Sequence, residues 1–282
     1  MKRMIYSLTA LLLIFSLSFG NTAFAVAMPE ADRTEPSYLD FLIEEAFPSI
    51  QNGQVSPQWT SGAPDAATPK THGYITQVAY ELIRDDNFAA YYFYDGKLTQ
   101  LIRGSVLPDA DETNNAYAWH FYGENGKNYL GGSTTAYTKC IEHYNGAVAL
   151  YTSGQQDNAI EELGRALHFL QDINVPHHAK NATAVLTNHT QFESLAEENM
   201  ETFAVSGLTD TIYTDADNTL GTIIDDYADT ARFWYTKASS GDSSEMLSAA
   251  GSCVRNSQRA TATVLYKFML DVGYIVSVRS LP

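Results

Sequence analysis

The sequence predicts an all-α protein folded as a single compact multi-helix domain. Apolar residues recur at intervals of three and four in several segments after residue 71, which is the spacing of one helix face. Alternating strand patterns joined by Asn-Gly or Asp-Gly hairpin turns are scarce. The chain has 282 residues, of which 45% are hydrophobic, so it is long enough to bury a sizeable core.

The predicted helices follow one another from about residue 71 onward. The first begins near Thr71, because Ile75, Val78, Leu82 and their neighbours share one helical face. We expect further helices over 136–151, 159–170, 189–203, 220–237 and from 255 to about 272. Asp157 or Asn158 is expected to cap the helix that covers 159–170. Seven to nine helices are expected in all.

The N-terminus has the pattern of a secretory signal peptide over residues 1–25. Lys2 and Arg3 precede an apolar run over 5–19, and Ala23-Phe24-Ala25 offers a cleavage site. Cleavage after Ala27 and an uncleaved membrane anchor are the alternatives. We therefore expect a secreted, extracellular protein without a transmembrane anchor.

Residues 26–58 have the composition of a propeptide or an N-terminal extension. This stretch is rich in proline and acidic residues and cannot form a core of its own. A plain linker is the alternative. The remaining residues, 59–282, form the predicted catalytic domain.

The charge and the cysteines limit the classes of partner and compartment. The net charge of −16 argues against binding to nucleic-acid backbones and against strong attraction to anionic membranes. The only two cysteines are Cys140 and Cys253. They can form one disulfide in an oxidising compartment or serve as two small buried apolar residues.

The segment H-F-L-Q-D-I-N-V-P-H-H, residues 168–178, has the spacing of a metal site. His168 and Asp172 are four residues apart and so share one helix face. Pro176 is expected to end the helix and to let His178 turn toward a second cation. His189 and Glu193 repeat the four-residue spacing shortly afterwards. Two such pairs so close together indicate a multinuclear metal site.

The candidate ligands favour zinc and phosphoester hydrolysis. Five of the seven histidines are candidates: His72, His120, His168, His178 and His189. Imidazole with carboxylate oxygen suits zinc, which generates hydroxide from water at neutral pH. Clustered divalent ions also neutralise phosphate oxygens during an in-line displacement.

Beyond these motifs, the chain resembles the secreted bacterial zinc-dependent phospholipase C family, which includes the catalytic domain of clostridial α-toxin. Trp59 precedes His72, G-S-V-L-P-D ends at Asp109, and A-W-H-F-Y contains His120, all in the family's order. The resemblance implies an all-helical fold of the phospholipase C/P1 nuclease type with three zinc ions in a cleft. Asp111 is the competitor of Asp109.

The resemblance also implies how the ligands are divided. The first zinc is assigned to Asp109, His120, His168 and Asp172. The second is assigned to Trp59, His72 and Asp172, which bridges the two ions. The third is assigned to His178, His189 and Glu193. We expect His143 to lie on the surface and His177 to lie on the surface or behind the ligands, because Pro176 directs only one of the adjacent histidines inward.

The mechanism implied by the resemblance is attack of hydroxide on the phosphorus of a phospholipid at a membrane or micelle surface. Diacylglycerol leaves, and a phosphorylated head group is released. Asp109 is the candidate general base, and Tyr117 is the one aromatic residue retained for binding the head group. Because Trp59 can offer its amine only after the chain is cut before it, the precursor is expected to be a zymogen.

Two other readings remain open from the sequence. An S1/P1-type nuclease shares the tri-zinc plan, but its first histidine usually lies closer to the tryptophan and its last pair ends in aspartate. A non-catalytic secreted zinc-binding module would be expected to have lost ligands, and none is missing from this set. We expect a monomer that acts on phospholipid and not on nucleic acid.

Overall fold

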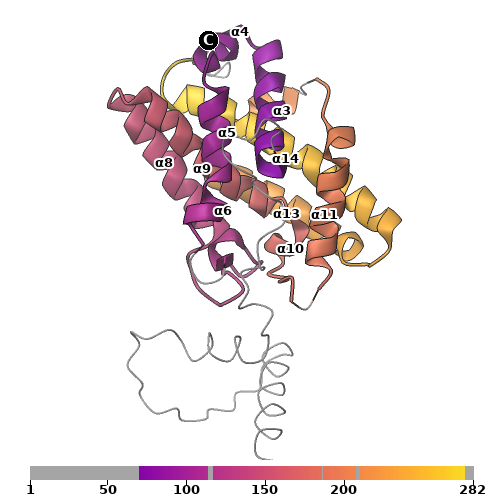
Figure 1. Ribbon diagram of the computed structural model, residues 1–282. Helices are drawn as coiled ribbons and strands as arrows, with labels where there is room; N and C mark the ends of the chain where they lie inside the picture. Colours follow the sequence, from indigo (N-terminus) through magenta and orange to yellow (C-terminus); the bar gives the residue numbers. More distant parts are fainter. Residues whose placement is uncertain (1–69, 114–116, 186, 208–209, 277–282) are drawn as a thin grey trace, which may run out of the picture. The chain divides into compact units, whose positions relative to one another are not determined.

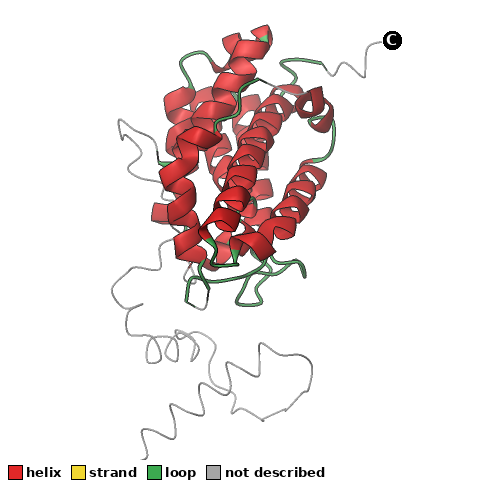
Figure 2. Ribbon diagram, turned by 90° about the vertical axis from the view of Figure 1, so that its right-hand side faces the viewer, coloured by secondary structure: helices red, strands yellow, loops and turns green. Residues whose placement is uncertain are grey.

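The computed structural model describes residues 70–113, 117–185, 187–207 and 210–276. The predicted signal peptide, the predicted propeptide and Trp59 lie outside these residues. The described residues contain eleven α-helices, two short 3-10 helices and no strand, so the all-α prediction is confirmed (Figure 2). None of the described helices is both long and apolar enough to span a bilayer.

The helices follow in the order of their labels in Figure 1. The first half comprises α3 (Thr71–Asp86), α4 (Phe88–Tyr94), α5 (Leu98–Val106), α6 (Pro108–Asp111), the 3-10 helix η2 (Ala118–His120) and α8 (Ala136–Thr152). The second half comprises α9 (Gln156–Ile173), α10 (Pro176–Ala179), α11 (His189–Asn199), η3 (Met200–Phe203), α12 (Asp210–Asp215), α13 (Leu220–Ala238) and α14 (Ser243–Asp271).

Helix α9 lies at the centre of the packing. It contacts α8 and α5 extensively and also contacts α14 (Figure 1). Its apolar side chains, such as Leu163, Leu167 and Leu170, are fully buried in the larger core cluster. Burial of each such side chain contributes about 1.5–3 kcal/mol. The amphipathic pattern predicted over 159–170 is therefore the pattern that places α9 in the core.

A pair of glycines lets α5 approach α9 closely. A Cβ atom on Gly104 would lie 2.0 Å from the backbone oxygen of Glu161, and one on Gly164 would lie 2.5 Å from the backbone oxygen of Leu101. Both distances are far below van der Waals contact, and backbone atoms cannot rotate away. The close approach brings the chain that follows α5, including α6, against the end of α9.

The helix boundaries differ from the predictions in three places. Helix α9 begins at Gln156 with Gln155 as its N-cap, so neither Asp157 nor Asn158 is the cap. The α-helix that starts at His189 ends at Asn199 and continues as 3-10 turns to Phe203. Helix α14 begins at Ser243, twelve residues before the predicted start, because the Asp242 side chain accepts two backbone N–H groups as an N-cap.

The expected number of helices, seven to nine, is too low for the described residues. The additional helices are short ones, notably α4, α6 and α12, whose few turns carry no clear apolar periodicity.

Cys140 and Cys253 are both buried and free, so they serve as two apolar side chains and not as a disulfide. Burial raises the pKa of both thiols.

Candidate metal centre

Eight of the nine predicted ligands lie in the described residues, and the structure brings them together near the carboxyl end of α9. His72 stands in the first turn of α3, Asp109 in α6 and His120 in η2. His168 and Asp172 lie in the last turns of α9, and α10 and α11 supply the rest: His178, His189 and Glu193. All are buried except Asp109, whose side chain is 10% exposed.

Asp172 lies between four of the candidate histidines, and its two carboxylate oxygens face different imidazoles. Oδ2 lies 2.8 Å from His120 Nδ1 and 3.2 Å from His168 Nε2. Oδ1 lies 3.7 Å from His72 Nε2 and 3.5 Å from His178 Nδ1. The short distance between His168 and Asp172 confirms that the two share one face of the helix.

Two further carboxylates complete the clusters. Asp109 Oδ1 lies 3.4 Å from His168 Nε2 and 3.6 Å from His120 Nδ1. Glu193 Oε1 lies 2.9 Å from His189 Nε2 and 3.4 Å from His178 Nε2. The candidate ligands form three groups, and within each group the ligand atoms lie within 4.8 Å of one another. The groups are His72, His168 and Asp172; Asp109, His120 and His168; and His178, His189 and Glu193.

The hydrogen bonds of three imidazoles orient them toward these clusters. His168 Nδ1 donates to the backbone oxygen of Ser105 at 2.9 Å, and His178 Nδ1 donates to that of His120 at 2.8 Å. His72 Nδ1 donates to Gln171 Oε1 at 2.8 Å. Because each Nδ1 is the donor in these bonds, the neutral form of each ring leaves its Nε2 lone pair for the cluster, which is the usual arrangement of a metal-ligating histidine.

The donor set and its spacing fit zinc. Ligand atoms around a tetrahedral zinc ion with bonds of about 2.0–2.1 Å are about 3.3 Å apart. The distances within the group of Asp109, His120 and His168, from 3.1 to 3.6 Å, are close to that spacing. Among the described residues, Asp172 Oδ1 is buried and accepts no hydrogen bond. Burying a carboxylate oxygen that accepts no hydrogen bond destabilises the fold unless a nearby cation compensates its charge.

The electrostatics keep the carboxylates ionised. Burial by itself would raise the pKa of Asp172, but the neighbouring imidazoles, with His168 foremost, hold it well below its usual value. The pKa values of Asp109 and Glu193 are lowered in the same way, against burial, by His168 and His189 respectively. Metal ligation requires deprotonated carboxylates, so the cluster meets that condition at neutral pH.

The prediction for His143 is wrong, because this side chain is buried. Its Nδ1 contacts Glu162 at 2.8 Å and its Nε2 contacts Glu112 at 2.9 Å. Glu112 also accepts from Lys139 and from Arg165, both at 2.8 Å. Its backbone oxygen accepts from His120 Nε2 at 3.3 Å, so this ionic network lies directly behind a candidate ligand.

His177 also faces inward, so the expectation that Pro176 directs only one histidine inward is wrong. Its ring is buried and stacks on His189 with centroids 4.8 Å apart and the planes nearly parallel. Its Nε2 lies 3.2 Å from Asn188 Oδ1. Burial and the nearby His189 lower the pKa of His177 to about 3, so the ring is neutral behind the cluster.

The other two candidates are placed as follows. The ring of Tyr117 meets that of His120 edge-on at 5.5 Å, and its backbone has a positive φ of 64°. Asp111 is paired with Arg165 and is 47% exposed on its side chain, so Asp109 is the aspartate that faces the histidines.

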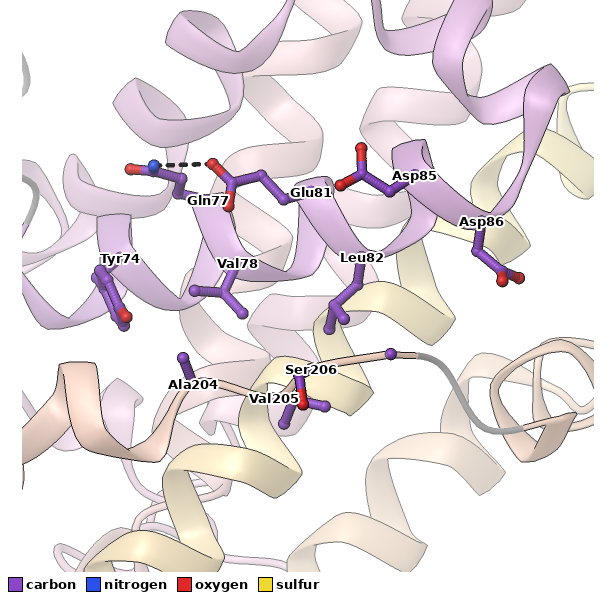
Figure 3. Close-up of a pocket in the computed structure, with 11 residues that line it drawn as sticks. Tyr74, Gln77, Val78, Glu81, Leu82, Asp85, Asp86, Ala204, Val205 and Ser206 are labelled. Atoms are coloured by element: carbon purple, nitrogen blue, oxygen red, sulfur yellow. Dashed lines mark hydrogen bonds between the residues drawn. The ribbon is translucent and has the colours of Figure 1, made fainter.

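A separate groove of about 380 Å³ lies between α3 and the segment 204–207. Val78 and Leu82 face this segment, and Glu81, Asp85 and Asp86 line the groove along α3 (Figure 3). None of its lining residues belongs to the three clusters. The clusters are therefore a site distinct from this groove.

The sequence reasoning missed Gln171, Glu112 and Ser105 as partners of the candidate ligands. Gln171 stands inside the motif that carries His168 and Asp172, but only the fold shows that its amide reaches His72. Glu112 and Ser105 act through backbone oxygens, for which the sequence carries no signal.

The chain matches several known phospholipases C in part. It is 29% identical to phospholipase C of Clostridium perfringens over 198 residues, which is 62% of this chain and 50% of that protein. It is 28% identical to phospholipase C of Listeria monocytogenes over 135 residues, which is 45% of this chain and 47% of that protein. The chain spans about half the length of the curated relatives it matches.

The fold is also that of solved α-toxins. The α-toxin of Clostridium absonum superposes with a TM-score of 0.67 over 74% of this chain and 65% of that one, at 24% identity. The family model described as zinc dependent phospholipase C matches residues 71–250, which contain all eight clustered side chains. The chain therefore belongs to the zinc-dependent phospholipase C family.

Proposed function

We propose that this protein is a zinc-dependent phospholipase C, which hydrolyses the glycerol-side phosphodiester of phospholipids to diacylglycerol and a phosphorylated head group. The main support for this proposal is the position of Asp172. Its two carboxylate oxygens face different imidazoles of the three ligand groups. Such a bridging carboxylate is what a site with neighbouring metal ions requires. Family membership supplies the substrate class.

The proposed ligands follow the three groups. Asp109, His120, His168 and Asp172 hold the first zinc, and His178, His189 and Glu193 hold the third. His72 and Asp172 hold the second together with the amine and carbonyl of Trp59. In this division Asp172 would be shared by the first two ions, in line with the different imidazoles that its two oxygens face.

The chemistry of the site comes from zinc together with the residues that surround it. Zinc bound there would lower the pKa of a water molecule to about 7 and neutralise phosphate oxygens. Asp109 is the proposed general base, because it is ionised and is the most accessible carboxylate among the candidate ligands. Tyr117 offers an aromatic face to the substrate beside His120.

The remaining features of the proposal concern the whole protein. We infer a secreted, extracellular enzyme of lipid degradation that works as a monomer at a membrane or micelle surface. Residues 1–25 are a signal peptide and residues 26–58 a propeptide, and the zymogen is activated by cleavage before Trp59. Mass spectrometry of the active secreted enzyme should find Trp59 at its N-terminus, whereas an active form that begins at residue 26 or 28 would contradict activation by cleavage.

The test of the function combines metal analysis with substrate assays on the mature protein. We expect about three zinc ions per chain, by the family's organisation, and release of phosphorylated head group from matched phosphatidylcholine, phosphatidylethanolamine and phosphatidylinositol vesicles. Single-stranded DNA serves as the second substrate. Hydrolysis of DNA without hydrolysis of lipid would establish a nuclease instead, and zinc binding without either activity would establish a binding module.

Asp109→Asn tests the assignment of the general base. The amide keeps the size of the side chain but cannot accept a proton, so activity should fall by about 10²–10⁴-fold. Zinc content is measured on the same sample, because the side chain is also a proposed ligand. Full activity with three zinc ions retained would exclude Asp109 as the base.

A further inference from the structure

Gln171 is a buried amide that links three helices around His72. It lies in the last turn of α9 and has no exposed surface. Its Oε1 lies 2.8 Å from His72 Nδ1 in α3. Its Nε2 donates to Thr76 Oγ1 at 2.9 Å, also in α3, and lies 3.4 Å from Thr261 Oγ1 in α14. Both ends of the amide are therefore engaged.

The orientation of this amide determines the tautomer of His72. With Nε2 directed at the two hydroxyl groups, Oε1 faces Nδ1 and can only accept a hydrogen bond. Nδ1 must then carry the proton of the neutral ring, and the Nε2 lone pair points toward Asp172 Oδ1, 3.7 Å away. The reversed amide would favour a proton on Nε2, which would block ligation by that nitrogen.

The position of His72 means that its tautomer affects the binding of one zinc ion only. Among the three groups found in the described residues, His72 belongs to the one with His168 and Asp172. His168 and His178 are oriented by different acceptors, the backbone oxygens of Ser105 and His120 respectively. A backbone carbonyl is present whatever the side chain, whereas the acceptor for His72 depends on the residue at position 171.

We propose that Gln171 is a positioning residue that fixes the Nδ1-protonated tautomer of His72 and thereby sets the zinc affinity of the His72–Asp172 site. This inference rests on the proposed zinc enzyme. It adds a determinant of metal affinity that lies outside the ligands themselves.

The test compares two variants of similar length by zinc titration against a chelating indicator. Gln171→Met removes the acceptor for His72, so one zinc site should weaken by about 10–100-fold while the other two keep their affinity. Gln171→Glu retains an oxygen acceptor for Nδ1 and should keep all three sites. The unfolding temperature of the zinc-free variants is measured in parallel, because a purely structural role would lower it in both without changing zinc affinity.

A second measurement observes the tautomer of His72 directly in the wild-type protein. Long-range ¹H–¹⁵N NMR of the zinc-free protein should show His72 protonated on Nδ1, with the resonance assigned by its loss in His72→Gln. Protonation on Nε2, or unchanged affinity at all three sites in Gln171→Met, would overturn the inference. A wild-type protein that binds no zinc would instead overturn the proposed function.

Discussion

The contact between Gly104 and Gly164 predicts that a single methyl group will disturb both stability and metal binding. In Gly104→Ala the new Cβ would lie 2.0 Å from the backbone oxygen of Glu161, so α5 must move away from α9 by roughly 1 Å. Such overpacking costs about 1–3 kcal/mol. The movement also stretches the 2.9 Å bond between His168 Nδ1 and Ser105, and a buried donor left unpaired costs about 1–3 kcal/mol more.

The expected loss of stability is therefore about 1–5 kcal/mol after allowing for the better helix propensity of alanine. Asp109 follows α5 closely and should be displaced with it, so the variant should bind less zinc. Unfolding by urea, with and without zinc, measures the first effect, and metal analysis measures the second. The chain offers a matched control in Gly146→Ala, where the three atoms nearest to the new Cβ all belong to the Glu162 side chain, the first at 3.1 Å, and none is a backbone atom.

The control should be neutral or slightly stabilising, because alanine is the better helix former. The reasoning would be refuted if Gly104→Ala unfolded within about 0.5 kcal/mol of wild type, the usual range of an indifferent substitution, and kept all its zinc.

Three further predictions concern the metal clusters and the network behind them. Metal analysis of Asp172→Asn should find one zinc ion where the proposal places three, because the shared carboxylate serves two sites. Glu193→Gln should lose only one ion. Equal losses in the two variants would argue against a bridging role for Asp172. Removal of zinc with EDTA should lower the unfolding temperature by at least about 5 °C, since ligand at 100-fold its Kd contributes about 2.7 kcal/mol, and added zinc should restore it. The pKa of Glu112 is raised by burial but lowered more strongly by hydrogen bonds from His143 and Lys139, to about 2 from an ordinary 4.5. The stability that Glu112 contributes is therefore complete above pH 4.5 and is lost as the pH falls toward 2. In the zinc-free protein, Glu112→Gln should therefore reduce the fall in the free energy of unfolding between pH 4.5 and 2. An unchanged fall over this range would contradict the prediction.

The sequence predicts the long helices well because their burial is periodic. The predicted ranges 136–151 and 220–237 end within one residue of α8 and α13. Helix α14 is predicted too short because its first turns, near Ser243, consist largely of small residues with few strongly apolar ones. Its partners, including α3 and α11, supply the burial that the local pattern does not reveal.

The candidate site shows the same division between local and long-range information. The pairs His168–Asp172 and His189–Glu193 are local, and helix geometry alone places each pair on one face. The burial of His143 depends on Glu112, which lies on another element thirty-one residues away. The acceptor for His72 is ninety-nine residues away in the chain. Contacts over such separations depend on how the helices pack, which no short motif specifies.

The hydrogen bond between His178 and the backbone of His120 predicts that the proposed metal sites fill cooperatively. His178, a proposed ligand of the third site, lies 2.8 Å from the backbone oxygen of His120, a proposed ligand of the first. An ion that fixes His120 also fixes the acceptor that orients His178, so the next ion binds to a ring that has already lost its freedom. Zinc should therefore enter this protein with a steeper binding curve than three independent sites would give.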